Sequence, residues 1–316
     1  MTTDKQLAIL AVGGNSLIID EAHKTVEDQY AAVVETCRHI AGLVKKGYRV
    51  VVTHGNGPQV GFILRRGELA RHELHEVPLD SCGADTQGAI GYQVQRAMYN
   101  EMMDWPQRPP VATVVTQVLV DRDDPSFRKP TKPIGSFMDS KTAEEHRQKD
   151  RWDIVEDAGR GFRRVVASPR PRRIIELEAI RRLLESDIVV VAVGGGGIPV
   201  VEDEQGRLQG AAAVIDKDLA TSLLARELKA DLLIISTAIE KVCLNYRKPD
   251  QKEIGRMTLA EAKRYLAEGH FAQGSMKPKI EAIIEFLESG GKQALITDPQ
   301  HLVPALEGRT GTWIVA

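Results

Sequence analysis

Short apolar runs alternate with longer amphipathic segments along most of the 316-residue chain. Most of the runs lack in/out alternation, which is typical of parallel strands buried on both faces, while the longer segments have helical spacing. The runs lie at residues 7–12, 48–53, 111–120, 187–193, 231–237 and 293–297, and the helical segments at 27–46, 85–103, 175–186, 217–229, 258–268 and 278–290. This alternation predicts an α/β fold of βαβ units, in which helices cover both faces of a mainly parallel sheet.

Two interruptions indicate how the chain divides. Between Asp121 and about Pro171 the sequence becomes polar, proline-rich and charged over a stretch too long for an ordinary connection. We predict a small protruding subdomain there, which serves either as a lid or as a purely structural flap. Near residues 229–231 one helix ends and a new βα series begins, so we place a lobe boundary between residues 1–229 and 230–316.

Composition narrows the functional classes. The formal net charge of −2 argues against a protein whose whole surface binds nucleic acid or a membrane. Among the arginines of residues 160–173, Phe162 is the one interleaved aromatic residue, which is too few for the stacking surface of a nucleic-acid binder. Three scattered cysteines fit reduced thiols, and no segment resembles a signal peptide or a membrane span. We therefore expect a cytoplasmic protein with no nucleic-acid or membrane partner.

Glycine-rich turns follow three of the predicted strands, at residues 11–15, 53–61 and 192–200. The carboxyl ends of parallel strands meet at one edge of a sheet, where ligands bind, and glycine lets backbone N–H groups approach an anion closely. The chain has neither the phosphate-binding G-x-x-x-x-G-K-[ST] motif nor the G-x-G-x-x-G dinucleotide pattern. An anion site at this edge would therefore need lysine or arginine side chains from elsewhere.

Lysines occur in the first turn of two predicted helices. Asp216 is placed to cap one helix, which then begins with Lys217 and Asp218; Ser275 is placed to cap another, with Lys279 in its first turn. An exposed cation at a helix N-terminus is disfavoured by about 0.3–1 kcal/mol. Either both lysines are simply solvated, or both helices direct their N-termini and their ammonium groups at one anion. The second interpretation fits phosphoryl transfer, whose catalysis consists mainly of positioning and charge stabilisation.

Several long strings together resemble the carbamate kinases of the amino acid kinase family. They are GGN (13–15), VVTHGNGPQVG (51–61), TQVLVDRDDPSFRKPTKPIG (116–135), VEDAGRGFRRVVASP (155–169), GGGGIPV (194–200), AVIDKDLA (213–220) and GHFAQGSMKPK (269–279). The resemblance implies an open αβα sandwich that transfers a phosphoryl group reversibly between ATP and carbamate, often toward ATP in nitrogen catabolism from arginine or purines. It also implies Mg²⁺ held mainly by the phosphates of ATP or ADP, without a protein metal site, and a homodimer.

The resemblance further implies roles for individual residues. Lys217 and Lys279 would stabilise the transferring phosphoryl group, with Asp218 as organiser. Lys132, from the protruding insertion, would replace the lysine that many amino acid kinases carry where this chain has Val12. The carbamoyl phosphate pocket would be lined by Gly13, Gly14, Asn15, Gly55, Asn56, Gly57, Gly195, Gly196 and Gly197. The candidate nucleotide contacts are Thr237, Ala238, Tyr246 and Met276, the last two being equally compatible with core positions.

Some features leave alternatives open. Ala238 stands where the family often has an aspartate, and Asp85 is an added carboxylate near the predicted start of a helix; these two departures leave the substrate and nucleotide preference open. We interpret His54 as a packing or hydrogen-bonding residue, because a carbamate oxygen is already anionic and needs no general base. A kinase for another small carboxylate and a catalytically silent nucleotide-binding homologue are the alternatives. Retention of the lysine set argues against silence.

Overall fold

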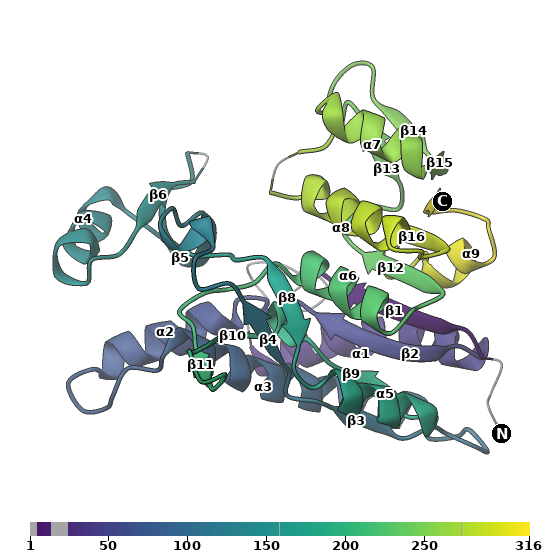
Figure 1. The fold of residues 1–316 in the computed structure, drawn as a ribbon, viewed down its shortest axis with the longest axis horizontal. Helices are drawn as coiled ribbons and strands as arrows, with labels where there is room; N and C mark the ends of the chain where they lie inside the picture. Colours follow the sequence, from purple (N-terminus) through teal and green to yellow (C-terminus); the bar gives the residue numbers. More distant parts are fainter. Residues whose placement is uncertain (1–4, 14–24, 158, 273) are drawn as a thin grey trace.

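The computed structural model describes residues 5–13, 25–157, 159–272 and 274–316. These residues form an eight-stranded central sheet in the order β15-β17-β16-β12-β1-β2-β9-β3, in which only β16 and β17 pair antiparallel (Figure 1). The strands are β1 (Leu7–Val12), β2 (Arg49–His54), β3 (Val111–Thr113), β9 (Val189–Val191), β12 (Leu232–Ser236), β15 (Arg256–Thr258), β16 (Gln293–Thr297) and β17 (Thr312–Val315). The predicted mainly parallel sheet is confirmed.

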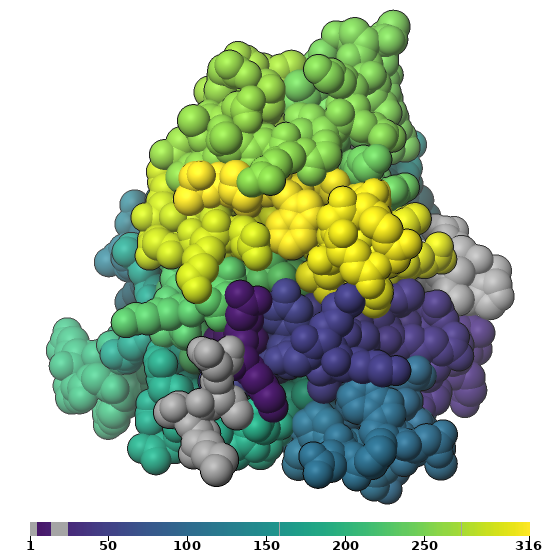
Figure 2. All heavy atoms as spheres, turned by 90° about the vertical axis from the view of Figure 1, so that its right-hand side faces the viewer, coloured from purple at the N-terminus to yellow at the C-terminus, as the bar shows by residue number. Residues whose placement is uncertain are grey.

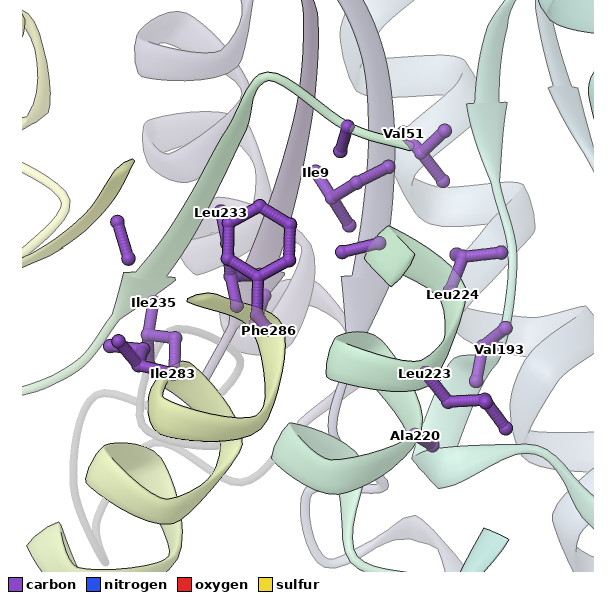
Figure 3. Packing of buried hydrophobic residues seen from close by; sticks show 14 of the residues in the cluster. Ile9, Val51, Val193, Ala220, Leu223, Leu224, Leu233, Ile235, Ile283 and Phe286 are labelled. Carbon is purple, nitrogen blue, oxygen red and sulfur yellow. The ribbon is translucent and has the colours of Figure 1, made fainter. Parts of the chain in front are cut away.

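Each face of the sheet is covered by its own set of helices, as an αβα sandwich requires. Ile9 of β1 packs into one core and its neighbour Leu10 into the other, because successive strand side chains point to opposite faces. Figure 3 shows Ile9 among residues of α6 and α8 in the first of these cores. That core is built with α5 (Leu177–Glu185), α6 (Lys217–Glu227), α7 (Leu259–Ala267) and α8 (Met276–Glu288), and the other with α1 (Val26–Lys45), α3 (Leu79–Glu101) and α9 (Leu302–Leu306).

The single strand predicted over residues 111–120 is wrong, because the structure divides it between two sheets. β3 ends at Thr113, and β4 (Gln117–Val120) pairs with β8 and β10 in a second, four-stranded sheet of order β11-β10-β4-β8. At the break, the side chain of Gln87, from the distant helix α3, bonds both the N–H and the carbonyl of Thr116. The other strands of this sheet are β8 (Pro171–Ile174), β10 (Ile198–Glu202) and β11 (Leu208–Gly210).

Two helix predictions are also corrected. α3 begins at Leu79 rather than at residue 85, so Asp85 lies in its second turn and is exposed instead of standing at the helix start. α2 (Gln59–Ala70) was not predicted. Only Val60 of α2 is buried, so this helix lacks the broad apolar face that periodicity analysis detects.

The polar excursion forms a protruding subdomain, which we call the lid and define as residues 132–166. It contains β5 (Lys132–Met138), α4 (Ser140–Lys149), β6 (Ile154–Glu156) and β7 (Phe162–Val166), and its strands pair antiparallel in the order β5-β7-β6. A short 3₁₀ helix, η2 (Pro125–Phe127), precedes it, and β8 begins at Pro171, where the excursion was predicted to end. Figure 1 shows the lid projecting away from the central sheet.

The C-terminal segment stacks on the rest of the chain. From the side, Figure 2 shows the yellow and light-green C-terminal residues above the purple and blue N-terminal ones. This segment also contains a hairpin of β13 (Val242–Leu244) and β14 (Lys252–Ile254). The predicted lobe boundary at residue 229 falls between α6 and β12 and stays a prediction. Within the described part of the chain, no helix combines the length and apolar character needed to span a membrane.

Candidate active site

A cavity of about 1110 Å³ opens at the carboxyl ends of β1 and β2, between the lid and α8. The turns after these strands supply Gly13 and Gly55 to its wall. The lid supplies residues 132–137 and Arg163, and the N-termini of α6 and α8 supply the rest of the charged lining. The cavity therefore occupies the sheet edge at which the glycine-rich turns predicted a ligand site.

Three lysine ammonium groups surround two carboxylates in this cavity. The Asp218 carboxylate lies 3.1 Å from Lys217 Nζ through Oδ1 and 2.9 Å from Lys279 Nζ through Oδ2. The third ammonium, of Lys132, lies 2.9 Å from Asp216 Oδ2. All four predicted catalytic residues thus line one cavity. Lysines 62 residues apart on two helices meet at one carboxylate, as the interpretation based on the helix N-termini predicted.

Local sequence explains how a lysine comes to begin α6. Asp216 caps the helix, since its Oδ1 accepts hydrogen bonds from the N–H groups of Asp218 at 2.9 Å and Leu219 at 3.4 Å. Lys217 donates to the carbonyl of Val12 at 3.2 Å, so its ammonium group reaches the end of β1. At α8, Ser275 occupies the N-cap position as predicted, but its side chain makes no capping hydrogen bond.

Burial and charge compete at the Asp218–Lys217 pair. Burial of Asp218 favours its neutral form, but the charges of Lys217 and Lys279 outweigh it and lower the pKa of the carboxyl to about 2. Burial lowers the pKa of the Lys217 ammonium; Asp218 opposes that shift, and Lys279 adds to it. With a side chain only 5% exposed, Asp218 remains an ionised carboxylate held between two cations. A phosphoryl group entering this cavity would meet positive charge already fixed in place.

The glycine turn after β9 packs directly against the turn after β2. Gly195 has φ +68°, and a Cβ there would lie 1.9 Å from Asn56 Oδ1, so only glycine fits. Asn56 Oδ1 is itself buried and has no hydrogen-bond partner among the described residues. Both residues line the cavity, as do Gly55 and Gly57. An unsatisfied amide beside closely approached backbone is suited to binding a small polar ligand.

Two of the predicted substrate residues lie outside the cavity wall. Gly196 and Gly197 do not line the cavity; their positive φ angles bend the chain behind it, where Gly196 backs onto the carbonyl of Ile215 and Gly197 onto Val118. Gly14 and Asn15 lie outside the described residues.

Of the predicted nucleotide contacts, the cavity includes only Ala238. The N–H of Thr237 donates to the carbonyl of Thr297, Tyr246 is 48% exposed on the segment between β13 and β14, and Met276 packs against the hydrophobic core. The structure therefore does not bring these four together around the cavity.

Two buried polar side chains support the glycine turns, and Gln87 is one that sequence reasoning missed. Besides its bonds to Thr116, Gln87 Nε2 donates to the carbonyl of Gly194 at 3.0 Å. His54 also packs against Gly194, so close that a Cβ there would be 2.4 Å from Nε2. His54 Nδ1 donates to the Gly55 carbonyl at 2.9 Å. A lone glutamine in a helix carries no sequence signal for such a role, which depends on the partner turn.

His54 is placed as a packing and hydrogen-bonding residue. Burial lowers the pKa of its imidazole to about 4; the Gly55 hydrogen bond opposes this shift, and Lys217 adds to it. The ring is therefore neutral at neutral pH, with Nδ1 protonated because a carbonyl can only accept. It does not line the cavity. This placement agrees with the interpretation of His54 as a residue other than a general base.

Comparisons with known proteins identify the class. The model of the amino acid kinase family matches residues 6–298, and the chain belongs to this family. Within it, the chain is similar to carbamate kinases and carbamate kinase-like proteins.

One relative, the carbamate kinase-like protein YahI of Escherichia coli (strain K12), is 51% identical, with 98% of this chain and 99% of the relative covered. The carbamate kinase of Thermococcus kodakarensis is 46% identical over 97% of this chain and 98% of its own. Among solved structures, carbamate kinase from Giardia lamblia bound to AMP-PNP superposes with a TM-score of 0.93 at 40% identity, over 100% of this chain and 99% of the other.

Proposed function

We propose that this protein is a carbamate kinase, which catalyses ATP + carbamate = ADP + carbamoyl phosphate in either direction. The observation that carries the proposal is the meeting of Lys132, Lys217 and Lys279 around two carboxylates in one cavity at the sheet edge. The similarity to named carbamate kinases over nearly the whole chain supports the choice of carbamate as the acceptor.

The lysines act by positioning and charge. The transferred phosphoryl group carries negative charge on its equatorial oxygens, and Lys217 and Lys279 approach it from two helix N-termini, whose dipoles add to the attraction. Asp218 holds both ammonium groups at fixed positions. The carbamate oxygen is already anionic, so it attacks without a general base, and the catalytic contribution lies in fixed cations that stabilise the transition state.

Lys132 and the glycine turns complete the site. Lys132 brings a third cation from the lid, and the lid shields the phosphoryl group from water during transfer. Asn56 and the backbone of Gly55, Gly57 and Gly195 bind the carbamoyl group, for which the buried and unsatisfied Asn56 Oδ1 offers an acceptor to the carbamate NH₂.

Magnesium enters with the nucleotide in this proposal. Among the described residues there is no cluster of three or more histidine, cysteine or acidic side chains that could hold a metal, and both cavity carboxylates are paired with lysines. These residues fit a metal that is ligated mainly by ATP or ADP phosphates and water. When bound, Mg²⁺ neutralises phosphate charge, while the protein supplies the lysines.

We also propose a cytoplasmic homodimer that pairs through one face of α3. Tyr92 and Tyr99 of α3 lie seven residues apart on one face and are 58% and 56% exposed, and Met103, just beyond the end of the helix, is 62% exposed. Arg96 stacks between Tyr30 and Tyr92, with its guanidinium carbon 3.6 Å and 5.1 Å from the ring centroids. Tyrosine, arginine and methionine are enriched in interfaces. Sedimentation of the wild type should give twice the mass of the chain, and Met103→Glu should sediment with the mass of a single chain.

The test of the activity is ATP formation from ADP, Mg²⁺ and carbamoyl phosphate, followed by a coupled assay. We expect the turnover number of Lys217→Ala to be about three orders of magnitude below that of the wild type, because a fixed cation at the transferring group is lost. Lys277→Ala is the matched control: its ammonium lies near the N-terminus of α8, pairs with Glu281 at 3.8 Å and does not line the cavity. It should keep its activity.

Two results would contradict the proposal. A folded wild-type protein that binds ATP but makes none from carbamoyl phosphate is not a carbamate kinase, and other acyl phosphates would then be screened. Equal losses in Lys217→Ala and Lys277→Ala would show that the cavity lysines have no special role.

A further inference from the structure

The carboxylate of Asp216 serves two distant parts of the chain. Its Oδ1 caps α6 through the N–H groups of Asp218 and Leu219. Its Oδ2 accepts a hydrogen bond at 2.9 Å from Lys132, which lies 84 residues away in the sequence. Capping requires only one of these oxygens. The contact with Lys132 is therefore not explained by the local folding of α6.

Lys132 is the first residue of β5, the strand that leads into the lid. It pairs with Val166 of β7, and the next residue, Ala167, accepts a hydrogen bond from the N–H of Val214 at 2.9 Å. Both strands at the base of the lid thus lie beside the segment that leads into α6. The Lys132–Asp216 ion pair adds the side-chain connection between the lid and the helix that carries Lys217.

The two aspartates that flank Lys217 differ in exposure. Asp218 is 5% exposed, and both of its oxygens face lysines of the protein body. Asp216 and Lys132 are 21% and 33% exposed and line the cavity. A half-exposed ion pair is weak, so an anion that enters the cavity can displace it. Asp218 is more buried than Asp216, so it keeps Lys217 and Lys279 in place while an anion in the cavity meets their ammonium groups.

We infer that Asp216 is a positioning residue. It holds Lys132 of the lid beside α6 until a phosphoryl group replaces the Asp216 carboxylate as the partner of Lys132. The inference rests on the proposed function for the identity of the incoming anion. The phosphoryl group displaces Asp216 because it meets Lys217, Lys279 and two helix N-termini in the same cavity. Lys132 then moves from one anion to the other over a short path, and the base of the lid moves with it.

Hydrogen exchange of the full-length, ligand-free protein tests the tether. Asp216→Asn keeps a capping oxygen and removes the charge, whereas Lys132→Met removes the other partner and leaves the cap intact. We expect amide exchange in 132–138 and 162–166 to be about threefold faster in each variant than in the wild type. The double variant should exchange no faster than either single one, because both changes break the same pair.

Asp139→Asn is the matched control. Asp139 is the N-cap of α4, and its carboxylate accepts from the N–H of Thr142 at 2.7 Å. This variant should leave exchange in 132–134 and 164–166 unchanged. Unchanged lid exchange in both Asp216→Asn and Lys132→Met would overturn the inference, as would additive effects in the double variant. If Asp216→Asn also accelerates exchange in 217–227, the cap has been lost and Lys132→Met alone decides the question.

Calorimetric titration with ATP and Mg²⁺ tests the displacement step. Asp216→Asn should bind about threefold more tightly than the wild type, because Lys132 no longer has to leave a carboxylate. The gain should be smaller in the Lys132→Met background. An equal or weaker affinity in Asp216→Asn overturns the displacement step. Neither measurement depends on turnover, so a wild type that makes no ATP refutes the proposed function while the exchange result on Asp216 stands.

Discussion

His54 allows a quantitative prediction about stability and pH. Its imidazole is buried against Gly194, and burial lowers its pKa from 6.5 to about 4. As the pH falls below 6.5, the unfolded chain takes up a proton at this site while the folded chain does not. A group with this shift therefore withdraws stability as the pH falls from 6.5 toward 4 and has little effect above pH 7.

The magnitude follows from the shift. Each pKa unit corresponds to about 1.4 kcal/mol, so lowering the pH from 7 to 5 should remove about 2 kcal/mol from the free energy of unfolding through His54 alone. His54→Asn removes the titration but keeps an N–H donor for the Gly55 carbonyl. The advantage of the wild type over His54→Asn should therefore shrink by about 2 kcal/mol between pH 7 and pH 5.

Urea unfolding at pH 7, 6 and 5 measures this difference, because every other titrating group is shared by the two proteins. If the free energies of unfolding of the wild type and of His54→Asn change by the same amount between pH 7 and pH 5, the reasoning is refuted. Equal changes would mean that the folded protein protonates His54 as readily as the unfolded chain does, and the imidazole would then have to reach water or an acidic partner.

Two further predictions concern the glycine turn and the thiols. Gly195→Ala should lower kcat/KM by at least about tenfold, since its Cβ forces Asn56 to move. The control Gly206→Ala also has a positive φ, +76°, but no atom near its Cβ, so it should cost only about 1–2 kcal/mol of stability and no activity. Similar activity in the two variants would contradict the contact between residue 195 and Asn56. Burial raises the pKa of the Cys37 thiol to about 12 and that of the Cys82 thiol to about 11. A thiol reagent at pH 8 should therefore label half-buried Cys243 first and reach the other two cysteines only on unfolding. Labelling of Cys37 in the native protein would show that its helix opens.

The sequence was a good guide wherever a local pattern carries the information. The strand at 7–12 and the helix over 27–46 were predicted to within one residue, because an unbroken apolar run and a long amphipathic period are both local. The juxtaposition of Lys217 and Lys279 was predicted from an electrostatic anomaly, a cation at the start of each helix. In the structure their ammonium groups lie 3.1 Å and 2.9 Å from the carboxylate of Asp218.

What the sequence missed depends on contacts between distant segments. Nothing in residues 111–120 announces that Gln87 will take up the hydrogen bonds of Thr116, where the strand breaks. The partnership of Asp216 with Lys132 was equally hidden, because its capping role already accounts for an aspartate before a helix. A residue with one sufficient local explanation gives no sign of a second, distant one.

The pairing of β1 with β12 has a mechanical consequence. β1 pairs with β12 in parallel register from Ala8–Leu232 to Val12–Ser236, so the strands of the two predicted lobes belong to one continuous sheet. A hinge between those strands would have to break backbone hydrogen bonds in the most buried part of the molecule. The central sheet therefore behaves as a stiff plate, whereas the lid is joined to the second sheet through the segments that follow β4 and precede β8, which leaves the lid as the part that can swing. In the proposed function, opening and closing over the substrate would then concern mainly this arm, while α6 and α8, which carry Lys217 and Lys279, stay packed against the sheet.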